Sequence, residues 1–275
     1  MFRKWQESKE SLYKVNSVKG FNLRKKLEEF KKEGKKAFIP YIMAGDPSLE
    51  ETGRRLKLLS QAGADLIELG VPFTDPLADG PTIQRAAERA LKSGTTLRKI
   101  LKFLGEFKGE VDTPIILMTY LNPVFCYGIE KFFHDAKEAE VAGVIFPDLT
   151  VEESKEYKDF ARKYGIDIIF LVAPTSTSER VKKVVRASTG FVYYVSITGI
   201  TGTELRLDNT FKEHIDFVKS FGKPVCLGFG VSKPEEAKYV SQFADGVIVG
   251  SAIVKQFHEN SETAFNFIKS LREAI

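Results

Sequence analysis

The chain has 275 residues, 43% of them hydrophobic, which is typical of a globular protein with a sizeable core, and its net charge is +4. The charge is unevenly distributed, because residues 1–36 hold twelve Lys and Arg against five Asp and Glu, whereas the rest holds 29 against 32. A slightly acidic main domain argues against a nucleic-acid-binding protein, which needs a basic face on the folded domain.

The sequence also argues against a membrane or secreted protein. No apolar run reaches the length of a transmembrane helix, and residues 1–20 lack the apolar core of a secretory signal. Cys126 and Cys226 are too few and too far apart for a disulfide framework or a metal site. We therefore expect both to be reduced thiols. We therefore expect a cytoplasmic protein.

Strands and helices alternate regularly along the chain. Apolar residues at helical spacing predict an N-terminal helix over 21–30, and a helical pattern follows each predicted strand. Short apolar runs predict eight strands, at 37–43, 65–69, 114–119, 143–146, 167–172, 191–196, 224–227 and 246–249. The helix-capping pattern Ser/Thr-x-x-Glu follows several of these strands, at 48–51, 150–153, 176–179 and 232–235.

Eight strand–helix units predict the α/β class, as a single (β/α)8 TIM barrel with an extra N-terminal helix. An open, doubly wound sheet is the alternative. No linker divides the chain, so we expect residues 20–275 to form one catalytic barrel domain. Residues 1–19 are then an N-terminal extension to which the sequence assigns no role.

Carboxylates gather in the stretch DLIELGVPFTDPLADG, residues 65–80. Strand alternation places Glu68 on the same face as Leu66, at the end of the second strand. An acid within an apolar run is costly unless it is paired or used, and barrel active sites lie where the strands end, which favours a catalytic role. A structural ion pair is the alternative. Asp75 and Asp79 follow in the next loop, and their spacing does not indicate which of the two belongs to the active site.

Glycines follow the seventh and eighth strands, at Gly228, Gly230 and Gly250, and Ser251 then opens a helical stretch. Glycine lets backbone N–H groups approach an anion, and a helix start favours negative charge. Gly228 with Gly230, or Gly250 with Ser251, would by itself also be typical of a tight turn. Together, at the position where barrels often hold phosphate, they predict a phosphate site. The glycine-containing loop at 197–202 either closes over a ligand or is simply long.

The sequence lacks the residues that metal-dependent or dinucleotide-dependent reactions would need. His134, His214 and His258 fall within predicted helices, where we expect solvated side chains rather than metal ligands. No dinucleotide-binding fingerprint follows the first strand. Proton transfer by carboxylates on a phosphorylated substrate remains, and from the residues alone a phosphate-binding isomerase stays open as an alternative.

Several runs, in order, resemble those of the tryptophan synthase alpha subunit family: PYIMAGDPS, ELGVPFTDPLADGPTIQ, TYLNPV, PDLTVEES, VSITGITG, LGFGVS and VGSAIVK. The likeness extends from about residue 20 to the C-terminus. It implies a (β/α)8 barrel that cleaves indole-3-glycerol phosphate to indole and glyceraldehyde 3-phosphate. It also implies an α2β2 assembly with a beta subunit that carries pyridoxal phosphate and receives the indole, with no cofactor or metal in this chain.

The resemblance assigns roles residue by residue. Glu68 corresponds to the general acid/base, Asp79 to the partner of the indole nitrogen, and Tyr193 to the hydroxyl that supports the catalytic acid. Asp75 corresponds to a loop residue facing the site and the beta subunit, and Thr201 to a residue that contacts Asp79 on loop closure. The indole pocket is assigned to Tyr41, Met118, Ile145 and Phe229. The phosphate site is assigned to Gly202, Gly230, Gly250 and Ser251.

The implied mechanism uses two carboxyl groups in different protonation states. Protonated Glu68 gives a proton to indole C3 and then takes one from the glycerol hydroxyl, while ionised Asp79 stabilises charge on the indole nitrogen. Two alternatives share these residues: a stand-alone indole-releasing lyase, and a non-catalytic subunit that only activates its partner.

Overall fold

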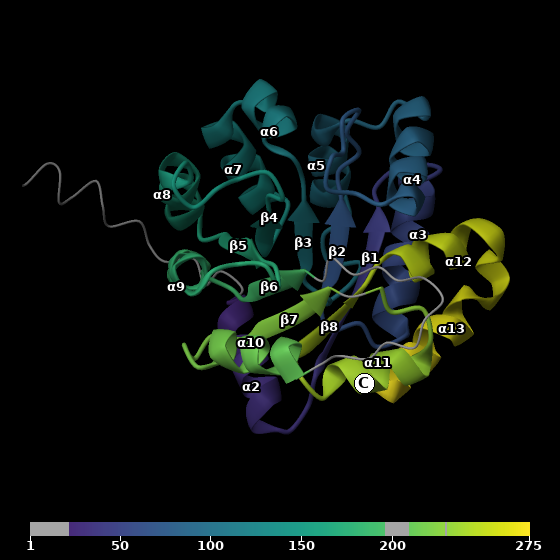
Figure 1. Ribbon diagram of the computed structural model, residues 1–275. Helices are drawn as coiled ribbons and strands as arrows, with labels where there is room; N and C mark the ends of the chain where they lie inside the picture. Colours follow the sequence, from purple (N-terminus) through teal and green to yellow (C-terminus); the bar gives the residue numbers. More distant parts are fainter. Residues whose placement is uncertain (1–21, 196–208, 229) are drawn as a thin grey trace, which may run out of the picture.

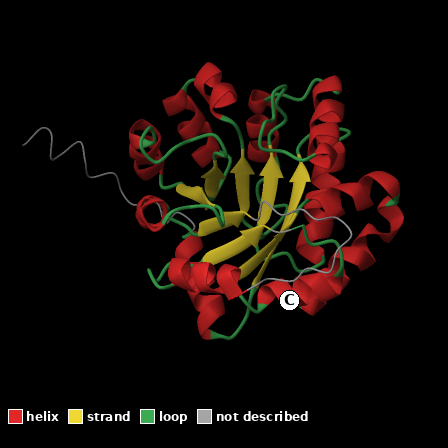
Figure 2. Ribbon diagram, in the orientation of Figure 1, coloured by secondary structure: helices red, strands yellow, loops and turns green. Residues whose placement is uncertain are grey.

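The architecture is a closed barrel of eight parallel strands, β1 to β8, paired in chain order with β8 closing on β1 (Figure 1). It is a computed structural model that describes residues 22–195, 209–228 and 230–275. Helices surround the strands on the outside (Figure 2). The predicted (β/α)8 barrel is therefore confirmed, and the alternative open sheet is wrong. The predicted extension over 1–19 lies outside the described residues.

All predicted strands are present, with ends that differ from the predicted ones by at most two residues. Their bounds are β1 Ala37–Met43, β2 Ile67–Gly70, β3 Ile115–Met118, β4 Gly143–Ile145, β5 Asp167–Val172, β6 Val192–Val195, β7 Val225–Gly228 and β8 Gly246–Val249. The helices that precede β5 are α2 Leu23–Lys32, α3 Leu49–Gln61, α4 Pro81–Lys92, α5 Leu97–Glu106, α6 Leu121–Tyr127, α7 Ile129–Glu138 and α8 Lys155–Tyr164. Those that follow it are α9 Ser178–Ala187, α10 Asn209–Lys219, α11 Pro234–Ser241, α12 Ser251–Glu259 and α13 Ser261–Ala274.

The extra N-terminal helix, α2, lies across the N-terminal end of the barrel, opposite the strand arrowheads (Figure 1). Leu23 and Leu27 are fully buried and belong to the apolar cluster that fills the barrel interior. The N–H of Leu23 donates to Asp167 at the start of β5, at 3.2 Å. This helix closes one end of the barrel, so a ligand reaches the interior from the other end.

The strand alternation predicted around Glu68 is confirmed by the packing. Leu66 belongs to the cluster inside the barrel, whereas Ile67 and Leu69 belong to the cluster between strands and helices. Because side chains alternate along a strand, Glu68 shares the interior face with Leu66. The barrel therefore directs this carboxyl inward.

At two of the predicted capping boxes the hydroxyl accepts the expected backbone N–H. Ser48 accepts the N–H of Glu51 at the start of α3, at 3.1 Å. Thr150 and Glu153 bond reciprocally, but they stabilise a turn, because α8 begins only after Ser154.

The other two boxes are displaced by one residue. At α9 the N-cap is Thr177, since the hydroxyl of Ser176 accepts a bond within the turn after β5. At α11 Pro234 occupies the first helical position, so Lys233 is the N-cap and Glu236 receives its N–H.

Candidate active site

A cavity of about 250 Å³ opens at the C-terminal ends of the strands. It brings together most of the residues singled out in the sequence: Tyr41, Glu68, Asp79, Met118, Ile145, Tyr193, Gly230, Gly250 and Ser251. Asp75 is exposed on the loop after β2 and does not line the cavity. Thr201, Gly202 and Phe229 lie outside the described residues.

Glu68 occupies the middle of β2, in register with Tyr41 on β1 and Ile116 on β3. Its side chain is 1% exposed, and neither carboxyl oxygen has a hydrogen-bond partner among the described residues. Burial, followed by the negative charge of Asp79, raises the pKa of Glu68 to about 8. Desolvation disfavours the charged form, so this carboxyl carries a proton at neutral pH.

Asp79 lies in the loop between β2 and α4, next to Gly80, the N-cap of α4. Its N–H donates to the carbonyl of Pro76 at 3.0 Å, and its own carbonyl accepts from the side chain of Gln84 at 2.8 Å. Burial raises the pKa of Asp79 to about 6, and hydrogen bonding from the Tyr120 hydroxyl opposes this rise. At neutral pH Asp79 is therefore ionised while Glu68 is protonated.

Tyr41 and Tyr193 bring hydroxyl groups to the cavity wall, and each needs a glycine beside it. A Cβ on Gly70 would lie 2.0 Å from the Tyr41 hydroxyl oxygen, and one on Gly228 would lie 2.5 Å from that of Tyr193. Gly70 was not singled out in the sequence, although a glycine ending the strand that carries Glu68 was a visible signal. Burial raises the pKa of both tyrosines well above the ordinary value, so both hydroxyls remain protonated.

The glycine side of the cavity meets the start of α12. Ser251 is the first residue of this helix. The N-cap residue is Gly250, which has no side chain to accept a hydrogen bond from the helix start. The first N–H groups of a helix have no partner within the helix, and its dipole favours an anion. Among the residues that the structure describes, none lies within 4 Å of where a Cβ on Gly230 would be, which leaves room for a ligand. This side of the cavity is suited to a phosphate group.

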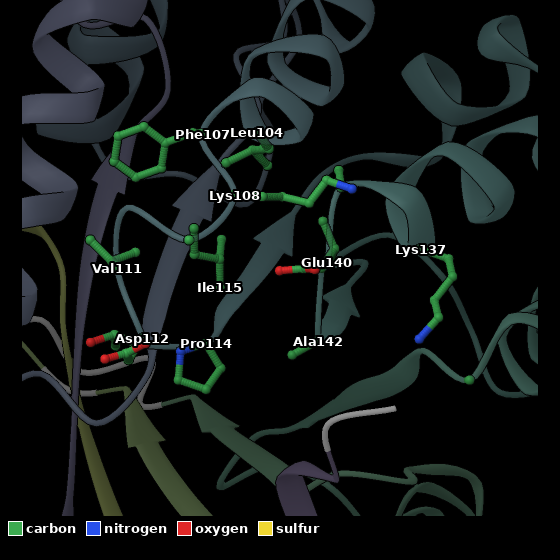
Figure 3. A pocket seen from close by; sticks show the side chains of 15 residues that line it. Leu104, Phe107, Lys108, Val111, Asp112, Pro114, Ile115, Lys137, Glu140 and Ala142 are labelled. Carbon is green, nitrogen blue, oxygen red and sulfur yellow. The ribbon is translucent and has the colours of Figure 1, made fainter. Parts of the chain in front are cut away.

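A second hollow, of about 330 Å³, lies at the opposite end of the barrel, beside the segments that enter β3 and β4 (Figure 3). Lys108, Asp112, Lys137 and Glu140 line it, together with apolar side chains such as Leu104. Its two carboxylates are solvent-exposed and lie far from the strand ends where Glu68 and Asp79 meet. It offers no buried acid and is not the candidate active site.

The described residues contain no group of three or more His, Cys, Asp and Glu side chains suited to a metal. His134 and His258 are exposed, as predicted. The prediction of a solvated side chain is wrong for His214, whose Nδ1 lies 2.8 Å from the Tyr194 hydroxyl and whose Nε2 lies 3.1 Å from the Ser176 carbonyl oxygen. Tyr194 is buried between barrel and helices, and a buried tyrosine hydroxyl needs such a partner.

The model of one protein family, described as "Tryptophan synthase alpha chain", matches residues 27–274. The chain belongs to the tryptophan synthase alpha chain family. The resemblance inferred from the sequence runs is thereby confirmed. As a member, the chain is a lyase-type enzyme of the alpha reaction in tryptophan biosynthesis. Within the described residues, no helix is both long and apolar enough to cross a membrane.

Individual relatives are similar to this chain, in sequence or in structure, over most of its length. The tryptophan synthase alpha chain of Geobacter sulfurreducens is 46% identical over 253 residues, which cover 90% of this chain and 96% of that protein. The one from Geotalea daltonii is 49% identical over 231 residues, covering 84% and 88%. Among solved structures, the alpha subunit from Legionella pneumophila has a TM-score of 0.85 at 37% identity, covering 93% of this chain and 99% of that one. A tryptophan synthase from Mycobacterium tuberculosis has a TM-score of 0.86 at 35% identity, covering 94% and 99%.

Proposed function

We propose that the cavity at the strand ends cleaves indole-3-glycerol phosphate to indole and glyceraldehyde 3-phosphate. The observation that carries the proposal is that a protonated Glu68 and an ionised Asp79 line one cavity together with the open start of α12. A retro-aldol cleavage needs both an acid that gives and takes a proton and a fixed negative charge.

The reaction begins when the Glu68 carboxyl donates its proton to indole C3. The positive charge that this places on the indole nitrogen is stabilised by the Asp79 carboxylate. Glu68, now a carboxylate, accepts the proton of the hydroxyl on the glycerol carbon bonded to C3. As that carbon becomes the aldehyde, the electrons of the C–C bond return to the ring and indole leaves, and the proton taken from the hydroxyl leaves Glu68 protonated again.

Binding is divided between an apolar and a glycine-rich wall. Met118 and Ile145, with the ring of Tyr41, offer a surface for indole, which we extend to Phe229. Gly230, Gly250 and Ser251 offer backbone donors for phosphate, which we extend to Gly202. We assign Tyr193 to the support of Glu68, and Thr201, which lies outside the described residues, to a contact with Asp79.

The proposed partner is a tryptophan synthase beta subunit that carries pyridoxal phosphate, in an α2β2 assembly. Two large apolar side chains support docking near the cavity mouth: Leu77, in the loop after β2, is 94% exposed, and Phe125, on α6 after β3, is 69% exposed. Exposed apolar residues at one rim favour a protein interface. Asp75 lies in the same loop as Leu77 and would face this partner.

The test is to incubate the purified chain with indole-3-glycerol phosphate and to follow free indole, with and without beta subunit. We expect slow release by the chain alone and faster release with the partner. Release that the beta subunit does not change would favour a stand-alone lyase. The chain would be a non-catalytic activator if it released no indole without the beta subunit and if, with the beta subunit present, wild type and Glu68→Gln gave the same rate of indole release.

A further inference from the structure

Tyr120 links the loop that carries Asp79 to the rigid barrel. It follows β3 directly, holds the N-cap position of α6, and is 5% exposed. Its ring packs against Phe73 of the loop after β2, with ring centroids 5.3 Å apart. Its hydroxyl accepts the backbone N–H of Ala78 at 3.1 Å, although the two residues are 42 positions apart in the sequence. The same hydroxyl also interacts with the Asp79 carboxylate.

We propose that Tyr120 is a positioning residue whose hydroxyl receives the Ala78 N–H, donates its own proton to Asp79, and so holds that carboxylate ionised and in one orientation. The inference rests on the proposed function, because it assigns a support to the charge that Asp79 supplies. It concerns a residue that neither the spacing of the acids nor the capping patterns pointed to.

The direction of the hydrogen bond follows from the chemistry of the phenol. Burial, followed by the charge of Asp79, raises the pKa of Tyr120, so the hydroxyl keeps its proton. A phenolic hydroxyl has a single proton to donate and accepts through its lone pairs. The Ala78 N–H occupies an acceptor site. The proton is thereby left for Asp79.

The anchor of Tyr120 does not depend on the loop it holds. The Tyr120 side chain makes no capping bond at α6. Instead, both carboxylate oxygens of Asp148, after β4, accept the N–H of Leu121, at 3.1 and 3.0 Å. A carboxylate at this position satisfies a free donor and complements the helix dipole. Tyr120 is thus fixed between β3 and α6, and the loop is held against it.

The other groups that face Asp79 do not supply the same support. Glu68 on β2, Tyr41 on β1 and Tyr193 on β6 each interact electrostatically with Asp79, and none of them is a cation. Among the described residues, the Tyr120 hydroxyl is the group that lowers the pKa of Asp79. Removing that hydroxyl should therefore make Asp79 harder to ionise.

The test replaces Tyr120 by Phe, which removes the hydroxyl and keeps the ring. The matched control is Tyr127→Phe on the same helix, whose hydroxyl also bonds to a carboxylate, that of Asp135, away from the cavity. The pKa of Asp79 is read from its carboxyl ¹³C chemical shift in the full chain, alongside kcat/KM for indole release between pH 5.5 and 8.5.

In Tyr120→Phe we expect the pKa of Asp79 to rise by about one pH unit, the scale of one lost hydrogen bond to a charged group. The value of kcat/KM should then fall about fivefold at pH 6 and stay near wild type at pH 8. The control should leave both readouts unchanged. An unchanged pKa of Asp79, or an equal loss at both pH values, would overturn the proposal.

Two further readouts keep the result decisive. If Tyr120→Phe does not fold, 3-fluorotyrosine at position 120 keeps the shape and strengthens the donor, so the pKa of Asp79 should fall, and an unchanged value would overturn the proposal. If the chain releases no indole but the pKa of Asp79 still moves in Tyr120→Phe, the proposed function fails while the positioning of Asp79 by Tyr120 stands.

Discussion

Replacing Glu68 by Gln is expected to stabilise the protein at neutral and alkaline pH while it abolishes indole release. The Glu68 side chain is 1% exposed, and burial, followed by the charge of Asp79, raises its pKa from 4.5 to about 8. Between these two values the folded chain holds a proton that the unfolded chain has lost. The folded state therefore loses stability as the pH rises through this window.

The size of the effect follows from the width of the window. Each pH unit corresponds to about 1.4 kcal/mol, so wild type loses about 3 kcal/mol by pH 7 through this one group. The loss reaches about 5 kcal/mol above pH 8 and then stops growing. Glutamine has the shape of the protonated acid and never ionises. The free energy of unfolding of Glu68→Gln should therefore increasingly exceed that of wild type between pH 5 and pH 8.

The assay is urea denaturation of wild type and Glu68→Gln at pH values from 5 to 9, with the free energy of unfolding obtained by linear extrapolation. Glu156→Gln, an exposed substitution on α8, is the matched control. We expect a difference that grows with pH for Glu68→Gln and a constant one for the control. A difference for Glu68→Gln that changes by less than about 1 kcal/mol over the range would refute the reasoning.

Other predictions address the site and its frame. The profile of kcat/KM against pH should be bell-shaped, with limbs near the pKa of about 6 for Asp79 and about 8 for Glu68; a flat profile would contradict it. Gly70→Ala should lower kcat/KM at least tenfold without unfolding the chain, because its Cβ would displace a tyrosine hydroxyl lying 2.0 Å away, and activity near wild type would count against this. Arg89→Ala should reduce the free energy of unfolding by about 3 kcal/mol, since it strips a bidentate partner at 2.7 Å from the buried Asp46; a loss below about 1 kcal/mol in urea denaturation would show the pair to be dispensable.

The sequence predicted the frame of the site because that frame depends on local patterns. Apolar runs and their alternation predicted β2 and the face that Glu68 shares with Leu66, and the packing clusters agree. Capping patterns were less reliable, since a hydroxyl already used in a turn at Ser176 and a proline at the first position of α11 each moved the cap by one residue.

The remaining features depend on contacts between distant segments. The spacing of the acids did not distinguish Asp75 from Asp79. The packing of the loop against the barrel does, because it places Asp79 in the cavity and leaves Asp75 exposed. His214 was expected in solvent because its partner, Tyr194, lies on another element. The bond between Tyr120 and Ala78 spans 42 positions, and no periodicity or spacing rule reports such a contact.

The protonation state of Glu68 in the resting protein is the quantity on which the catalytic account depends. It can be measured as the titration of the Glu68 side-chain carboxyl ¹³C signal in the full chain, assigned by its loss in Glu68→Gln. The account predicts a midpoint near pH 8, so that the carboxyl still holds its proton at neutral pH. A midpoint near the ordinary value of 4.5 would mean that Glu68 has no proton to give to indole C3, and would contradict the account.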